Sequence, residues 1–278
     1  METDISPDRI LPKAVEVYRK KSKMGIKKLM VLSFLAGIFI ALAAAGSSLA
    51  SANLLANKNS FGLGKLIQGL TFTPGLIFVI LAGGELFTGN CLMVFPLFEK
   101  KIKFSDLIKS WVLVYLGNFV GAIFVAYLLS KSGQFNLANG LIGERTILIA
   151  KAKIDLSFGE GLILGIFANF MVCLGVWMGF GGKSYSSKAI SAFFPVMLFV
   201  LSGFEHSIAN MYYIPAGIFA KNIPELAAKT GLNGEVLANL NFSNMITKNL
   251  LPVTLGNIIG GALLVGLAYF LAYKIEEK

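Results

Sequence analysis

The stretch Gly83-Gly84-Glu85-Leu86-Phe87-Thr88-Gly89-Asn90 interrupts a long apolar run, and a similar stretch 120 positions later, Gly203-Phe204-Glu205-His206-Ser207-Ile208-Ala209-Asn210, interrupts another. Both fit the pattern Gly-x-Glu-x-x-x-small-Asn. A carboxylate within such a run is costly to place in lipid, so it is expected to face a cavity or a bundle interior. Paired interruptions in two halves of a chain are typical of a transporter's site at mid-membrane. The sequence therefore predicts a duplicated membrane protein with one pathway built from both halves.

The composition is that of a membrane protein. Of the 278 residues, 55% are hydrophobic and 14% are charged, and the mean hydropathy is +0.72, whereas soluble domains average about 25% charged residues. Six apolar runs are long enough to cross a bilayer, which takes roughly 20 residues. They lie near 29–51, 68–98, 108–130, 158–180, 190–219 and 249–273, and the second and fifth contain the interruptions. We predict a single all-α membrane domain over 1–278, with a charged N-terminal segment (1–28) and no cleavable signal peptide.

Basic residues are unevenly divided between the two sets of loops. The larger part of the 25 Lys and Arg residues falls on one side of the predicted bundle, in 1–28, 99–109, 181–189 and 274–278. Because loops rich in Lys and Arg stay in the cytoplasm, both termini are predicted to be cytoplasmic. The net charge of +10 then reflects topology and attraction to membrane lipid. No basic-aromatic module accompanies the charge, so no nucleic-acid partner is expected.

Further matches indicate an internal repeat. Leu116-Gly117-Asn118 in the third run matches Leu255-Gly256-Asn257 in the sixth, and Gly37-Ile38-Phe39 in the first matches Gly165-Ile166-Phe167 in the fourth. Three spans in each half would place the second repeat (158–273) upside down relative to the first (29–130), as in many transporters. The glycines in these matches are interpreted as sites of close helix packing.

His206 is the single histidine, and it lies in the second interruption. An ionisable side chain inside a span is a functional candidate, although a histidine that merely satisfies a buried neighbour is the alternative. Because imidazole changes charge near neutral pH, His206 is predicted to give a hydrogen bond or a proton to a passing anion. Thr88, in the first interruption, adds a hydroxyl group.

The interruptions also carry Glu85, Asn90, Glu205 and Asn210. Helices broken at membrane depth leave backbone groups unpaired, and these side chains are predicted to brace the two breaks. Direct contact with a substrate is the alternative. Paired carboxylates also suit acid–base catalysis, but no sugar-binding aromatic residues or soluble cleft accompany them.

Signatures of catalysis and of cofactor binding are missing from the sequence. It contains no P-loop, no GxSxG, no HExxH and no Asn-Pro-Ala pair of the aquaporin type. With one histidine and two separated cysteines, Cys91 and Cys173, neither a metal site nor a disulfide framework is expected. No cofactor is predicted, and the protein is not expected to be an enzyme.

At these residues the sequence resembles the formate/nitrite transporter family. The matching stretches are 84–89, 169–174 with Trp177, 202–211 and 252–261, and the second half is especially similar to bacterial formate channels. The resemblance implies an aquaporin-like fold of six spans, a homopentamer with one pore per protomer in the cytoplasmic membrane, and a small monovalent anion as substrate. Formate is the expected anion. Nitrite and hydrosulfide stay open because Glu85 stands where formate channels have Asp, and Gly89-Asn90 replaces small hydroxylated residues.

The resemblance also assigns residues to the pore. It implies a central site at His206 and Thr88 with Asn169 and Val172 nearby, and an anion-attracting base at Lys153. It implies an omega-shaped loop at 86–88, and hydrophobic constrictions at Phe72, Leu76, Leu86, Phe87 and Phe199. From the residues alone, such apolar side chains usually belong to a core, and only the helix interruption suggests a hydrophobic gate.

These features suggest how an anion could pass an apolar constriction. Lys153 and helix N-termini would raise the local anion concentration, and His206 would then bind or protonate the anion. Protonating a carboxylic acid of pKa near 4 at pH 7 costs roughly 4 kcal/mol, which is comparable with the desolvation avoided. Two other classes stay open: an aquaporin-like channel for neutral solutes, and an intramembrane enzyme using Glu85, Glu205 and His206.

Overall fold

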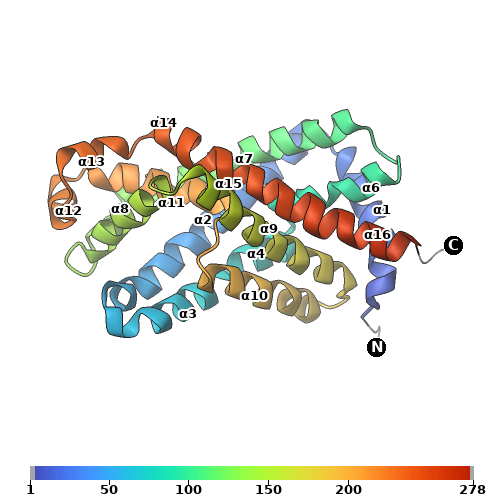
Figure 1. The fold of residues 1–278 in the computed structure, drawn as a ribbon, viewed down its shortest axis with the longest axis horizontal. Helices are drawn as coiled ribbons and strands as arrows, with labels where there is room; N and C mark the ends of the chain where they lie inside the picture. The colour runs from blue at the N-terminus through green and yellow to red at the C-terminus, as the bar shows by residue number, and fades with distance from the viewer. Residues whose placement is uncertain (1–3, 276–278) are drawn as a thin grey trace.

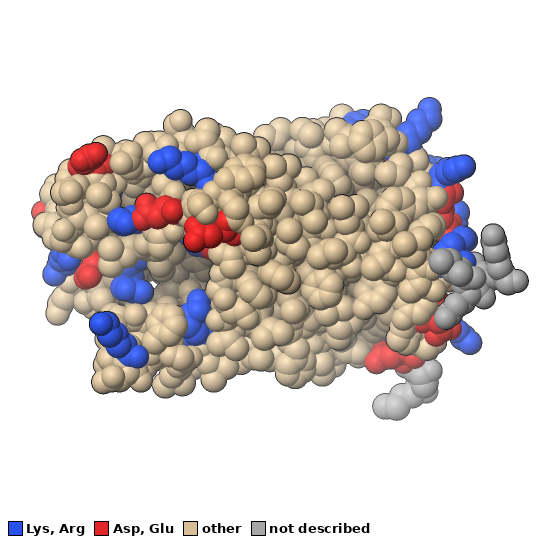
Figure 2. Space-filling view, in the orientation of Figure 1, with Lys and Arg blue, Asp and Glu red and all other residues tan. Residues whose placement is uncertain are grey.

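The computed structural model describes residues 4–275, and every regular element in that range is helical (Figure 1). Five helical segments are long and apolar enough to cross a membrane: Ile26–Ala56, Lys58–Gly83, Phe104–Lys131, Phe158–Gly181 and Phe242–Lys274. Figure 2 shows the middle of the molecule almost free of charged side chains, with blue and red atoms gathered at its two ends. The predicted all-α membrane protein is confirmed at this level.

The long segments comprise several helices. The first is α2 (Ile26–Ala56), the third α7 (Phe104–Lys131) and the fourth α9 (Phe158–Gly181). The second contains α3 (Phe61–Phe72), α4 (Pro74–Phe78) and a π-helical turn at Val79–Gly83. The last contains α14 (Phe242–Asn244), α15 (Leu251–Ile258) and α16 (Ala268–Ile275), with π-helical turns at Met245–Leu250 and Ile259–Leu267. The second segment thus begins at Lys58 rather than near 68, because polar residues such as Lys65 and Gln68 hide its first turns from a search for apolar runs.

The chain leaves helical geometry at both interruptions. In the first, Gly83 takes the left-handed conformation (φ 89°), and the helix resumes at α5 (Phe87–Asn90) and α6 (Val94–Phe98). In the second, α10 (Tyr185–Leu201) ends before Gly203 (φ 75°), and α11 (Ser207–Lys221) follows. The predicted fifth run is therefore divided into helices of 17 and 15 residues, each shorter than a full span. Only glycine adopts such positive φ angles at little cost, so each break begins at a glycine.

Two helices of more than ten residues lie outside the predicted spans. The helix α1 (Ile10–Ser22) buries one apolar face against α6 and α9, and α8 (Leu141–Ile154) packs against α11. Sequence reasoning treated both regions as loops because their apolar residues form a stripe rather than a continuous run. Figure 1 shows α1 and both chain ends at one end of the molecule, and α8, α12 (Pro224–Lys229) and α13 (Gly234–Asn239) at the other. We call these the α1 end and the α8 end.

Glycine contacts fix how the two halves correspond. A Cβ on Gly121 would lie 2.2 Å from the Phe34 carbonyl oxygen, and a Cβ on Gly260 would lie 2.0 Å from that of Ile166. These clashes explain the close packing of α7 on α2 and of α15 with its following turn on α9. They pair Phe34 with Ile166, so Ser33 corresponds to Gly165. The match of Gly37 with Gly165 expected from the sequence is therefore wrong by one helical turn.

Candidate functional site

Two cavities enter the bundle from opposite ends, and a small chamber lies between them. The α1-side cavity, of about 540 Å³, has Leu76 and Leu86 among its lining residues. The α8-side cavity, of about 310 Å³, is lined in part by Phe72, Phe199 and His206. All five of these residues also line the chamber. They therefore form the two partitions that separate the chamber from the cavities.

The chamber is almost closed. Its volume is about 10 Å³, which is near the minimum that holds one water molecule. Phe72 and Phe199 meet edge to face, with ring centroids 5.7 Å apart. Leu76 and Leu86 are 2% and 3% exposed. Val172, predicted near the central site, also lines the chamber. A small anion can pass only if the partition side chains move apart.

His206 joins the two breaks. Its Nδ1 accepts a hydrogen bond from the backbone N–H of Ala209 at 3.1 Å, so the imidazole caps the start of α11. Its Nε2 lies 2.9 Å from Oγ1 of Thr88 in the other break. Because Nδ1 accepts, the proton of the imidazole is assigned to Nε2, which donates to the threonine hydroxyl. The one imidazole N–H is thus aimed at the contact between the two halves.

The first break is held by ionic and amide contacts. Glu85 is buried, and its carboxylate accepts hydrogen bonds from Nζ of Lys21 at 3.1 Å and from Nδ2 of Asn90 at 2.9 Å. The backbone N–H of Glu85 donates to the Leu32 carbonyl. Trp111 Nε1 donates to the carbonyl of Asn90. These contacts hold the Glu85 carboxylate within the break, and Lys21 compensates its charge.

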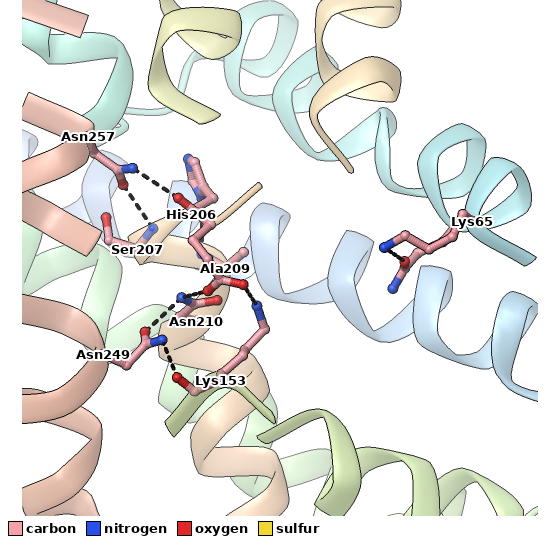
Figure 3. A network of polar contacts seen from close by, with 10 residues as sticks. Lys65, Lys153, His206, Ser207, Ala209, Asn210, Asn249 and Asn257 are labelled. Carbon is pink, nitrogen blue, oxygen red and sulfur yellow. Dashed lines mark hydrogen bonds and ion pairs between the residues drawn. The ribbon is translucent and has the colours of Figure 1, made fainter. Parts of the chain in front are cut away.

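The second break repeats these contacts with other residues (Figure 3). Glu205 accepts from Nζ of Lys153 at 2.8 Å and from Nδ2 of Asn210 at 2.6 Å. Its backbone N–H donates to the carbonyl of Leu164. Asn249 adds a link that fixes Lys153, because its Nδ2 donates to the Lys153 carbonyl and its Oδ1 accepts from Asn210. Removing one partner of such a buried ion pair leaves an uncompensated charge.

One asparagine side chain satisfies the open backbone at each break. Asn118 Oδ1 accepts from the N–H of Phe87, and its Nδ2 donates to the carbonyls of Glu85 and Ser33. Asn257 makes the same three bonds, with the N–H of Ser207 and the carbonyls of Glu205 and Gly165. Sequence reasoning matched these asparagines to each other but assigned a role only to the neighbouring glycines, as packing positions. Their recurrence next to glycines in both halves was the available signal.

Several predicted residues lie elsewhere. Phe87, expected at a constriction, packs edge-on against Trp111 and Tyr115 and lines none of the three cavities described above. Asn169 is fully buried and donates to the Asn257 carbonyl at 2.6 Å, beside the chamber rather than in its lining. Lys153 lies in the last turn of α8, and its ammonium stands 5.1 Å above the Tyr213 ring. Lys21, its counterpart at the first break, was missed because it lies in the charged N-terminal segment.

The remaining chemistry-bearing groups have local roles. Cys91 and Cys173 are buried thiols, and Cys173 donates to the Thr88 carbonyl at 3.2 Å. Among residues 4–275, no group of three or more His, Cys, Asp or Glu side chains is placed to hold a metal ion. Two cavities that enter from opposite ends, a nearly closed chamber between them and helices broken at membrane depth are typical of a membrane transport protein.

Comparison with known proteins agrees with this class. The model of the formate/nitrite transporter family matches residues 8–271. The formate channel FocA of Escherichia coli strain K12 is 40% identical over 284 residues, covering 100% of this chain and 99% of the relative. The formate channel BtFdhC of Bacillus thuringiensis is 36% identical, covering 98% and 97%. A solved pentameric formate channel with formate bound superposes with a TM-score of 0.80 at 37% identity, covering 90% of this chain and 98% of the other.

The chain belongs to the formate/nitrite transporter family. It is therefore a multi-pass membrane transport protein rather than an enzyme, and the intramembrane enzyme considered for Glu85, Glu205 and His206 is set aside.

Substituting Asn257→Leu tests the brace at the second break. Leucine has a similar volume but leaves one N–H and two carbonyls unpaired in a buried site, at about 1–3 kcal/mol each. We expect a large fall in the thermal midpoint and in the yield of folded protein, measured by fluorescence-detected size exclusion after heating. The exposed Asn239→Leu serves as control. Equal stability of Asn257→Leu and wild type would contradict the bracing role.

Proposed function

We propose that this protein is a channel for small monovalent anions and that formate is its main substrate. The proposal rests on one observation. Two cavities from opposite ends meet a central chamber, and the imidazole of His206 lies at the wall of that chamber with its N–H directed to Thr88. Similarity to formate channels over the whole chain supports formate as the anion. Nitrite and hydrosulfide are the alternatives within the family.

We infer six spans arranged as an inverted repeat, 29–130 and 158–273, within a single membrane domain over 1–278. The second and fifth spans are then the broken ones, as in the aquaporin-like architecture. The matched contacts of Glu85 with Lys21 and of Glu205 with Lys153 support this symmetry. Both chain ends lie at the α1 end, which carries most of the basic loops, so we place both termini in the cytoplasm. A pentamer in the cytoplasmic membrane is inferred from the pentameric relative.

The two Glu–Lys pairs give the path its electrostatic character. Each pair is neutral as a unit, so neither break presents a bare carboxylate that would repel an anion. Lys21 and Lys153 each keep some donors free of their carboxylate, because an ammonium has three N–H groups. An anion that arrives in either cavity therefore meets a hydrogen-bonded lysine before it meets an apolar partition.

His206 helps the anion through the apolar partition by donating a hydrogen bond. In the structure Nε2–H donates to Thr88, and the anion oxygen takes the place of the threonine hydroxyl as acceptor. Nδ1 is occupied as acceptor by the Ala209 N–H, so donating a proton outright would leave an anionic imidazolate. The geometry therefore supports hydrogen bonding over proton donation by neutral His206, and any proton that travels with formate would come from water in a cavity.

Anion uptake into proteoliposomes tests the function directly. Formate, nitrite, hydrosulfide and acetate are compared at two pH values, with empty liposomes as control. We expect formate to cross fastest and acetate to lag. Passage of a neutral solute such as glycerol without any anion flux would contradict the proposal and favour an aquaporin-like channel.

Substituting His206→Asn separates two roles of the imidazole. Asparagine retains an acceptor for the start of α11, where it is a preferred capping residue, but it lacks the N–H that reaches Thr88. A hydrogen bond to a charged group contributes about 1.5–3 kcal/mol, so formate flux per assembled protein should fall about tenfold or more. His206→Phe, which loses both roles, should also be less stable. Flux of His206→Asn equal to wild type would rule out the donor role.

Substituting Leu76→Ala tests the partition on the α1 side. If Leu76 gates the chamber, shrinking it should raise the acetate-to-formate flux ratio. The control is Leu92→Ala, which truncates a fully buried leucine that lines none of the three cavities. Both variants should be destabilised by about 2–5 kcal/mol, but only Leu76→Ala should change the ratio. The same ratio in both variants would assign Leu76 to the core alone.

A further inference from the structure

The α8-side cavity contains more positive charge than its carboxylate neutralises. Lys65, Arg145 and Lys153 all line it, and Glu205 is the acidic residue in the lining. Glu205 is already paired with Lys153 at 2.8 Å. The positive charge that is free to attract an anion therefore resides on Lys65 and Arg145 rather than on Lys153, which sequence reasoning had assigned to that role.

Within residues 4–275, neither of these two side chains forms an ion pair with a carboxylate, and the Glu205 carboxylate in the same cavity is paired with Lys153. Lys65 Nζ donates to the neutral Oε1 of Gln68 at 3.2 Å. Arg145 is half-buried, and among residues 4–275 its buried Nε has no hydrogen-bond partner. A buried donor without a partner is costly and is usually satisfied by a bound group or by water. The Nε atom itself is closed off from solvent, so it marks a guanidinium left unpaired at the cavity wall rather than a donor open to the cavity.

The two cations approach the cavity from different helices. Lys65 lies on α3, and its Nζ would be 3.6 Å from a Cβ placed on Gly203 at the second break. Figure 3 shows Lys65 apart from the network that joins Lys153 to Asn249 and Asn210. Arg145 precedes Lys153 by eight residues on α8, which places it about 12 Å away along the helix axis, and both side chains line the cavity. Figure 2 shows basic side chains around a hollow at the α8 end, with acidic ones on one side of it.

The chemistry of the pair suits a small oxyanion. A guanidinium presents N–H groups in a planar fork that matches the two oxygens of a carboxylate, and an ammonium adds a point charge. Lys65 lies close enough to Lys153 for their positive charges to repel each other, and an anion bound beside Lys65 would lower this repulsion.

We propose that Arg145 and Lys65 form an anion-binding subsite in the α8-side cavity, distinct from the contacts of Lys153 and His206, for a small monovalent carboxylate or related oxyanion. The proposal rests on the proposed anion channel, because the ligand is the transported anion. The anion binds first at this subsite and then moves past Lys153 to His206.

The test uses Arg145→Gln, Lys65→Gln and the double variant in proteoliposomes, with Lys58→Gln as control. Lys58 is an exposed lysine shortly before α3 that does not line the cavity. Initial formate uptake is measured against formate concentration at low and at high salt. For the double variant at low salt we expect a half-saturating concentration raised about tenfold, as for the loss of a charge-assisted hydrogen bond, with the maximal rate little changed. High salt should shrink the difference because it screens the charges. Arg145→Lys should recover part of the affinity.

A second measurement, the thermal midpoint with and without formate, distinguishes a wrong subsite from a wrong channel function. Formate should raise the thermal midpoint of the purified wild type, because a ligand that binds only the folded state stabilises it, and this shift should be largely lost in the double variant. If wild type shows the shift but no formate flux, the channel function fails and the subsite stands. If flux, half-saturation and thermal shift are all the same in the double variant and in wild type, the subsite is overturned.

Discussion

Two asparagine side chains, Asn118 and Asn257, make an open chain possible at membrane depth. A helix that breaks in hydrocarbon exposes N–H and C=O groups that lipid cannot satisfy. Each asparagine supplies one acceptor and two donors to the break beside it. With the backbone satisfied, side chains from the breaks are free to form the chamber wall. Thr88 and His206 can then meet at 2.9 Å from opposite halves of the chain.

Charge compensation is the second condition for an anion path. The carboxylates of Glu85 and Glu205 are each tied to a lysine and an asparagine, so they hold the breaks without repelling an anion. On the α8 side, the proposed subsite assigns the attraction of anions to Lys65 and Arg145, which line the cavity. The same arrangement explains why the path can be apolar at its centre and still belong to an anion transporter: the charges stand in the cavities, and one polar N–H stands at the chamber.

The sequence predicted the breaks well because both lie in long apolar runs and share a motif around Glu85 and Glu205. It also predicted that these carboxylates serve as braces. It missed Lys21 and the helix around Arg145, because amphipathic helices lack the continuous apolar run that marks a span. Asn118 and Asn257 were recognised as a matched pair, but hydrogen bonds to a backbone distant in sequence leave no spacing signal. Gly37 was aligned one turn away from its counterpart, Asn169, because a match of residue types does not show which residues make the same contacts.

We infer that the transported anion passes through the chamber between the breaks. Formate flux through Val172→Phe, measured per assembled protein, tests this inference, because Val172 lines a chamber of only about 10 Å³ and the larger ring would fill it. We expect the assembled variant to show formate flux near that of empty liposomes. Flux equal to wild type from assembled Val172→Phe would show that anions take another route.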